Sequence, residues 1–253
     1  MISECSSDPC SFYMGLELIL ASESPSLIQH FGASHLIALA GTFLIGFFVI
    51  YVSRKNQLSK ITTAIVVSIA FLLITAYPVK IIARYIDGIE IDKDVLFPLQ
   101  LCDVAAVTGF FALILKNRLC AEITYFFGLA GTLQALFTPS VCYDFPSISY
   151  FAFFQLHSIV VIAALYLPLA LGWRPRKGSV MRVWFCGICY AIIVGIFDFI
   201  TGANYGFFRE KAEGSLMDIL HPWPYYIIEM SVLALVLFFV LSVPFLRQSQ
   251  SKN

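Results

Sequence analysis

The sequence predicts an all-α protein that crosses a membrane seven times. Of its 253 residues, 59% are hydrophobic and 13% are charged, and the mean hydropathy is +0.84. A soluble domain carries about 25% charged residues, so most of this chain's surface is expected to lie out of contact with water. The apolar residues form seven stretches of about the length that crosses a bilayer as a helix: about 35–53, 61–82, 95–115, 119–138, 148–171, 180–201 and 222–246.

These stretches are expected to be helices because backbone polar groups in lipid must be hydrogen-bonded within their own segment. A transmembrane barrel would instead show shorter segments of alternating hydrophobicity. The predicted organisation is a non-cytoplasmic segment over 1–34, a transmembrane domain over 35–246 and a cytoplasmic tail over 247–253. Within the first part, residues 12–20 are too short to span and contain Glu17, so an interfacial helix is expected there.

The connections between the stretches predict the orientation in the membrane. Eleven Lys and Arg residues fall on one side, in 54–60, 116–118, 172–182 and the C-terminal tail. Five fall on the other side, and residues 1–34 contain none. Since cytoplasmic loops are enriched in Lys and Arg, the N-terminus is predicted outside and the C-terminus in the cytoplasm. The predicted location is the cell (inner) membrane, as a multi-pass protein.

Polar residues concentrate in the outward halves of the predicted helices, and the inward halves contain almost none. Ionisable groups in hydrocarbon are costly and usually mark a functional site. The distribution predicts a polar chamber within the membrane that opens toward the non-cytoplasmic side. Its members are Lys80, Arg84, Gln100, Cys102, Asp103, Gln134, Gln155, His157, Asp198 and Glu229.

Cys102 and His157 form a candidate nucleophile and base. Their two predicted helices begin on the outer side of the membrane. Cys102 lies roughly 10 Å below Val95, and His157 lies roughly 14 Å below Ile148. At a shared depth the imidazole takes the thiol proton and the thiolate attacks a carbonyl. Asp103 follows on the same helix and is a candidate to orient the histidine. The alternative is that the cysteine packs in an apolar helix and the histidine makes an ordinary helix contact.

The other charged residues admit a structural and a functional interpretation. Lys80 and Arg84 share a helix face at i, i+4, where they either pair with acids, reach toward the interface or hold a lipid phosphate. Asp198 and Glu229 lie toward the outer ends of the last two helices. Glu122, near an inner helix end, is expected to contact Arg118 at i−4.

Two further groups of residues allow less specific predictions. His35, Asn204 and Tyr205 lie near the predicted outer mouth and are candidates to line it. Cys5, Cys10 and Cys142 fall on the outer side, where a disulfide is chemically possible. Cys186 and Cys189 lie in an apolar helix with no neighbouring ligand, so packing is expected there instead of a metal or redox role.

Several runs of the sequence resemble the YwaF-like family of bacterial integral membrane proteins, which have seven predicted helices. The runs are Pro98-Leu-Gln-Leu-Cys102-Asp103, Gly128-Leu-Ala-Gly131-Thr-Leu-Gln134-Ala-Leu-Phe-Thr-Pro139, His157, Gly202-Ala-Asn204-Tyr205 and Pro222-Trp-Pro224. The family often has His where this chain has Gln100. It is distantly similar to the eukaryotic transmembrane protein 164, a phospholipid acyltransferase that uses a Cys and a His. The resemblance implies that Cys102 carries the acyl group and that His157 is its base.

Two functions are therefore carried forward. The first is a lipid acyltransferase or acyl hydrolase that acts on a membrane phospholipid or lysophospholipid. Its catalytic residues would be Cys102, His157 and Asp103. Its candidate binding residues are Lys80, Arg84, Gln100, Gln134, Asp198, Asn204, Tyr205 and Glu229.

The alternative is a transporter or channel for a small polar or charged solute, supported by the intramembrane charges. The apolar inner halves and the lack of an inverted repeat argue against it. A seven-helix receptor is disfavoured because 222–246 has no Lys for a retinal Schiff base. No cofactor, no metal and no nucleic-acid partner is predicted, and the sequence does not determine the oligomeric state.

Overall fold

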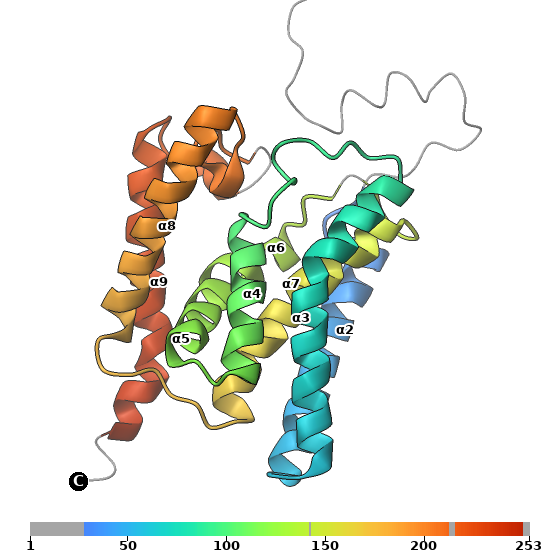
Figure 1. Ribbon diagram of the computed structural model, residues 1–253, viewed down its shortest axis with the longest axis vertical. Helices are drawn as coiled ribbons and strands as arrows, with labels where there is room; N and C mark the ends of the chain where they lie inside the picture. Colours follow the sequence, from blue (N-terminus) through green and yellow to red (C-terminus); the bar gives the residue numbers. More distant parts are fainter. Residues whose placement is uncertain (1–27, 142, 213–215, 250–253) are drawn as a thin grey trace, which may run out of the picture.

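The computed structural model describes residues 28–141, 143–212 and 216–249. The predicted interfacial helix over 12–20 lies outside these residues, as do Cys5, Cys10 and Cys142. The described residues form helices joined by turns and loops, as the all-α prediction requires (Figure 1). The main elements are α2 (Ala33–Lys55), α3 (Lys60–Ile86), α4 (Leu101–Ile114), α5 (Arg118–Phe127), η1 (Gly128–Thr132), α6 (Leu133–Phe137), α7 (Ile148–Leu169), α8 (Ser179–Thr201) and α9 (Tyr225–Ser249).

Six helices of the described chain are long and apolar enough to cross a membrane. They are Ala33–Lys55, Lys60–Ile86, Arg118–Phe137, Ile148–Leu169, Ser179–Thr201 and Tyr225–Leu246. Their outward faces carry exposed apolar side chains, among them Phe47, Phe199 and Ile200. Such faces suit a lipid environment and confirm an integral membrane protein.

The predicted span over 95–115 differs from the others. Only Leu101–Ile114 is helical there, and its 14 residues reach about 21 Å, less than the roughly 30 Å of a bilayer core. Pro98 and the extended backbone of Gln100 (φ −63°, ψ 147°) keep the preceding residues out of the helix. Seven full spans are therefore not confirmed, because α4 is a short helix enclosed by longer ones.

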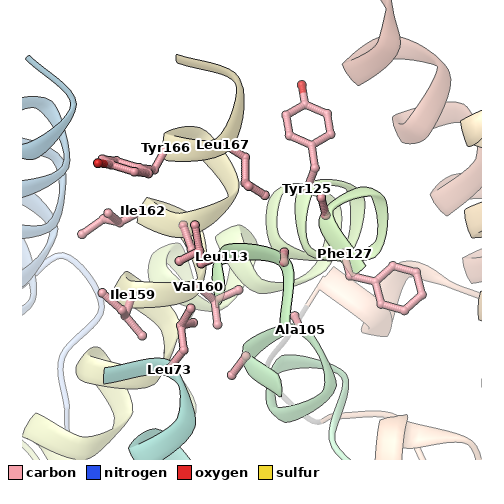
Figure 2. Packing of buried hydrophobic residues seen from close by; sticks show 14 of the residues in the cluster. Leu73, Ala105, Leu113, Tyr125, Phe127, Ile159, Val160, Ile162, Tyr166 and Leu167 are labelled. Atoms are coloured by element: carbon pink, nitrogen blue, oxygen red, sulfur yellow. The ribbon is translucent and has the colours of Figure 1, made fainter. Parts of the chain in front are cut away.

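The helix α7 lies at the centre of the bundle. It contacts α2, α3, α4, α5 and η1, and many of its residues are buried on all faces, as expected of a helix that is apolar all round. Figure 2 shows its Ile159, Val160 and Leu167 among side chains that include Leu73 of α3 and Leu113 of α4. This packing positions α3, α4 and α7 against one another.

The helices α8 and α9 lie side by side at one edge of the molecule, and α2 and α3 lie at the other (Figure 1). The connections gather at two ends. The α3–α4 loop and the segment after α8 share one end, whereas the α2–α3 turn, the α7–α8 connection and the end of α9 share the opposite one. The count of Lys and Arg residues on each side assumed the same two groups of connections. Which end faces the cytoplasm stays a prediction.

One predicted contact is wrong. The fully buried Glu122 of α5 does not pair with Arg118. Its carboxylate instead accepts hydrogen bonds from Nε and Nη2 of Arg176, both at 2.9 Å, and from Nη1 of Arg182 at 2.7 Å. A bidentate guanidinium contact plus a second arginine satisfies a buried carboxylate better than one i−4 neighbour. We call this trio the inner clasp, because it ties α5 to the α7–α8 connection and to α8.

Candidate functional site

The candidate site lies where α3, α4 and α7 meet, and it begins with a buried ion pair. Nζ of Lys80 on α3 donates to Oδ2 of Asp103 on α4 at 2.6 Å. The Asp103 side chain is 0% exposed and that of Lys80 18%. Lone charges at this depth are expensive, so pairing is expected. The second carboxylate oxygen, Oδ1 of Asp103, is buried with no hydrogen bond among the described residues.

His157 is held by its own helix. Its Nδ1 lies 2.7 Å from the carbonyl oxygen of Phe153 one turn earlier, and its ring stacks on the Phe153 ring with centroids 4.1 Å apart. A carbonyl oxygen only accepts hydrogen bonds, so Nδ1 carries the proton and Nε2 of the neutral ring is an acceptor. The orienting group is therefore this backbone carbonyl, while Asp103 contacts Lys80 instead.

Cys102 occupies the first turn of α4, half-buried and with a free thiol. The N-cap residue Gln100 makes no side-chain hydrogen bond to this turn. The backbone N–H groups of a helix start have no partner within the helix, and their dipoles favour negative charge. Burial of a thiol in apolar surroundings opposes this effect, so the helix start alone does not make Cys102 a thiolate.

The charge of Lys80 acts on both candidate catalytic residues, Cys102 and His157. Its positive charge favours a thiolate at Cys102 and disfavours a protonated ring at His157. No hydrogen bond joins the thiol to the imidazole in the described part of the chain. The structure thus brings Cys102, Asp103, His157 and Lys80 to one helix junction, where the Cys102 thiol and the His157 ring are not hydrogen-bonded to each other.

The outer side of this junction is covered by two loops that are bonded to each other. Gly206 donates its N–H to Oε1 of Gln100 at 3.0 Å, and Asn204 donates its N–H to Oδ1 of Asp94 at 2.8 Å. The Tyr205 hydroxyl accepts from the N–H of Phe97 at 2.8 Å. We call these contacts between residues 94–100 and 204–206 the outer cap. They explain why residues 95–100 leave the helical path.

Burial influences the acids and phenols of the outer cap. It raises the pKa of Asp94 above its usual range, against the opposing effect of the Asn204 N–H. It also raises the pKa of Tyr205. On α8, Oδ1 of Asp198 accepts from the Tyr205 N–H at 3.1 Å, and its Oδ2 is buried without a hydrogen bond among the described residues. Asp198 therefore anchors the cap to the end of α8.

The remaining predicted site residues lie outside the junction. Arg84 contacts Asp92 at 3.5 Å and the carbonyl of Glu90. Glu229 accepts the N–H of His221 at 2.9 Å and contacts its ring. Gln134 is exposed on α6.

Two further polar residues of the outer halves make backbone contacts. The amide of Gln155 donates to the carbonyl of Leu72 at 3.4 Å. His35 contacts the Leu136 carbonyl through Nε2 at 2.6 Å and accepts the Phe31 N–H through Nδ1. With both ring nitrogens engaged, His35 is a structural residue.

Sequence reasoning missed Tyr190 and the π-helix η1. The Tyr190 hydroxyl donates to the Leu99 carbonyl at 2.7 Å and interacts electrostatically with Cys102. Its position in an apolar run between predicted loops gave no signal. The helix η1 packs on α4 and α7, and its Thr132 hydroxyl is buried without a hydrogen bond among the described residues. π-turns of this kind are frequent at functional sites.

A shallow, open apolar groove of about 640 Å³ lies along α8, with Leu99 as its one lining residue from outside that helix. It is lined by Leu99, Arg182, Phe185, Cys186, Cys189, Tyr190, Ile193 and Val194. Cys186 and Cys189 thus line a surface in place of packing in a core. No group of three or more His, Cys, Asp and Glu residues that could hold a metal is found in the part of the chain that the structure describes.

Comparison with known proteins gives one result. The model of the TMEM164 family matches residues 30–242, which include α2 to α8, most of α9, the junction and the outer cap. Neither the curated proteins nor the solved structures give a significant match. The match covers well over half of the 253 residues. With its apolar spanning helices, the chain belongs to the TMEM164 family of integral membrane proteins.

Proposed function

We propose that this protein transfers acyl groups between membrane lipids through a thioester at Cys102. The observation that carries the proposal is the state of His157. Its Nδ1 proton is committed to the Phe153 carbonyl, which leaves Nε2 as a base at the junction that also holds Cys102. The resemblance of the sequence to YwaF-like proteins and to transmembrane protein 164 supports the same two roles.

The first half-reaction forms the thioester. Nε2 of His157 takes the proton from the Cys102 thiol, and the thiolate attacks the ester carbonyl of a phospholipid. A carbon–sulfur bond forms, the ester carbon–oxygen bond breaks, and the histidine returns the proton to the departing lysolipid oxygen. Catalytic hydrogen bonds often tighten only in the substrate complex, so the step requires Cys102 and His157 to come together when substrate binds.

The developing oxyanion needs hydrogen-bond donors close to the thiolate. The free N–H groups in the first turn of α4 are the nearest candidates, because Gln100 does not cap them. The Asn204 side chain is engaged within its own loop, donating to the Glu210 carbonyl at 3.0 Å, and Gln134 is exposed on α6. We therefore assign the oxyanion site to the α4 backbone.

The second half-reaction returns the acyl group to an acceptor. A lysophospholipid hydroxyl loses its proton to His157 and attacks the thioester, which gives a new phospholipid and restores the Cys102 thiol. Water in place of the lysolipid gives acyl hydrolysis. In this scheme Asp103 and Lys80 hold α4 against α3, and the outer cap with Gln100, Asn204 and Tyr205 forms the mouth next to the lipid headgroup.

The transporter alternative rested on the intramembrane charges. Lys80 is paired with Asp103, Arg84 with Asp92, and Glu229 with His221. These ion pairs stabilise a bundle and need no solute, and Asp198 accepts the Tyr205 N–H through Oδ1 while its Oδ2 has no hydrogen bond among the described residues. The paired charges therefore give the transport alternative less support than the sequence suggested.

The test is covalent labelling of the full-length protein in maltoside micelles. The reagent is p-nitrophenyl butanoate, and the site of acylation is mapped by peptide mass spectrometry. We expect wild-type protein to acquire the butanoyl group at Cys102. The variant His157→Gln should do so on the order of 10²-fold more slowly, since a positioned base contributes 10²–10⁴-fold.

Two controls separate chemistry from folding. Cys102→Ser should lose the label, whereas Cys120→Ser, which removes a thiol on α5, should keep it. Each variant is compared with wild type by its elution volume and melting temperature. Equal labelling of wild type and His157→Gln, or labelling spread evenly over the cysteines, would overturn the proposal.

A further inference from the structure

Two basic side chains converge at the end of α8 that is predicted outside. A Cβ added to Gly202, the C-cap residue of this helix, would lie 2.8 Å from Nζ of Lys93 and 3.6 Å from Nη1 of Arg209. Lys93 belongs to the α3–α4 loop and Arg209 to the segment after α8. Both residues are exposed, so two charges from distant parts of the chain meet near one point of the surface. We call Lys93 and Arg209 the outer basic pair.

Neither member of the outer basic pair is neutralised by a carboxylate contact. Within the described chain Lys93 forms no ion pair or side-chain hydrogen bond, and the Arg209 guanidinium makes one long contact, from Nη1 to the Ala203 carbonyl at 3.5 Å. The acids within electrostatic range of the pair are Asp94 and Asp198. These carboxylates accept backbone N–H groups of the outer cap instead, at 2.8 and 3.1 Å.

The outer cap holds the backbone beside both bases. The side-chain oxygen of Asn204 accepts the N–H of Arg209 at 3.0 Å. On either side of Lys93, the N–H of Asp94 donates to Oδ1 of Asp92 at 2.8 Å. An anion that binds here finds the backbone of both bases already ordered, which lowers the entropic cost of binding.

Two like charges near one point repel each other, and an anion between them removes the repulsion. The carbonyl groups at an exposed helix C-terminus attract bases only weakly, and they leave most N–H donors of the pair free. A phosphate group presents several charged oxygens, which suit the donors of both arginine and lysine. The geometry therefore favours a phosphate as the ligand of the outer basic pair.

The position of the pair relative to the membrane indicates the source of the phosphate. The helix α8 is long and apolar enough to span a bilayer, and Phe199 and Ile200 in its last turn are 86% and 76% exposed. Nε1 of Trp223 donates to the carbonyl of Phe208 at 3.1 Å, which brings an interfacial type of side chain next to Arg209. Exposed apolar residues followed directly by bases match hydrocarbon followed by lipid headgroups.

We propose that the outer basic pair binds the phosphate of a phospholipid whose acyl chains lie along the exposed end of α8. This binding site goes beyond the proposed function. It does not involve Cys102, and it would persist if no thioester formed.

The experiment is native mass spectrometry of the full-length protein released from maltoside micelles. Three probes are titrated separately: dioleoylphosphatidylglycerol, dioleoylglycerol, which has the same acyl chains without phosphate, and inorganic phosphate. The double variant Lys93→Gln with Arg209→Gln removes both charges of the pair. The matched control, Lys116→Gln with Arg118→Gln, removes one exposed lysine and one exposed arginine at the opposite end of the molecule.

We expect wild type to bind dioleoylphosphatidylglycerol more tightly than either other probe. The apparent Kd should rise at least about tenfold in the double variant, because hydrogen bonds to charged groups are among the strongest in proteins. The matched control should bind as wild type does, and Arg209→Lys, which keeps the charge, should retain most of the binding. Equal melting temperatures without added lipid show that the variants are folded.

Three results would overturn the proposal. Equal binding of dioleoylphosphatidylglycerol and dioleoylglycerol by wild type would show that the phosphate is not recognised. Equal phospholipid binding by the double variant and the matched control would exclude the outer basic pair. Inorganic phosphate that binds as tightly as the phospholipid, and is lost in the double variant, would identify a site for free phosphate. None of these results depends on acylation of Cys102.

Discussion

At the scale of single residues, the Lys80–Asp103 pair governs the junction. The carboxylate is wholly buried and has one charged partner at 2.6 Å. An ion pair in an apolar setting adds little net stability, but loss of one partner leaves an uncompensated charge, and that is costly. The pair also joins α3 to the first turn of α4, so it fixes the position of Cys102.

Lys80→Met is expected to lower the free energy of unfolding by about 3–5 kcal/mol, since it leaves Asp103 buried and unpaired. The measurement is denaturant unfolding in micelles. Lys60→Met, which changes an exposed lysine at the start of the same helix, should have little effect. The double variant Lys80→Met with Asp103→Leu should recover most of the loss. Equal stability of Lys80→Met and Lys60→Met would contradict the expectation.

The candidate residues could be predicted from the sequence in part. Polarity within apolar stretches identified Lys80, Cys102, Asp103 and His157, which the structure places at one junction. Their partners could not be predicted, because the contact of Asp103 with Lys80 depends on how α3 rotates against α4. The Phe153 carbonyl that orients His157 is a backbone group, and composition gives no signal for it.

At the scale of elements, η1 interrupts what the sequence presents as one helix over 119–138. Small residues permit the interruption: a Cβ on Gly128 would lie 3.0 Å from the Ala164 Cβ and 3.3 Å from Cγ1 of Val160. At Gly128 the small residue therefore lets this segment pack closely on α7. The change to π geometry depends on tertiary contacts with α4 and α7 and has no signature in hydropathy.

Gly128→Ala is expected to destabilise the protein by about 1–3 kcal/mol, because the added methyl meets two side chains of a packed helix. Gly195→Ala is the matched control, since no atom outside its own helix lies within 4 Å of the added carbon. The melting temperatures of both variants in micelles provide the measurement. A Gly128→Ala protein as stable as Gly195→Ala would show that α7 yields at this contact.

The inner clasp makes a second element-scale prediction. Glu122→Gln removes the charge that holds Arg176 and Arg182, so the α7–α8 connection should open more often. We expect faster backbone hydrogen exchange over residues 171–178. Asp218→Asn, an exposed acid far along the chain, should leave that exchange unchanged. Unaltered exchange in Glu122→Gln would mean that other contacts hold the connection.

At the scale of the whole molecule, the hydrophobic stretches predicted most of the membrane spans. The order of these stretches and the Lys and Arg residues between them predicted which connections share an end. Six spans agree with the stretches. The short α4 does not, because contacts between residues 94–100 and 204–206 withdraw the start of that stretch from the helix. Such long-range contacts between loops are not encoded in local hydropathy.

The orientation is tested by accessibility in intact cells. Single cysteines replace Gln57, at the α2–α3 turn, and Glu210, after α8, and both positions are exposed. A membrane-impermeant maleimide should label Glu210→Cys in intact cells and Gln57→Cys only after permeabilisation, as the distribution of Lys and Arg requires. The reverse pattern would place the N-terminus in the cytoplasm.

The groove along α8 has a kinetic consequence. The outer cap bonds the loops over one end of the molecule, and the inner clasp binds α8 to α5 at the other. Because α8 is a membrane span and the groove on it is open and apolar, an apolar molecule would reach the groove by lateral diffusion in the plane of the bilayer. Its rate of arrival should follow its mole fraction among the surrounding lipids, so dilution with an inert lipid should slow occupancy even when the total amount of ligand in the sample is constant.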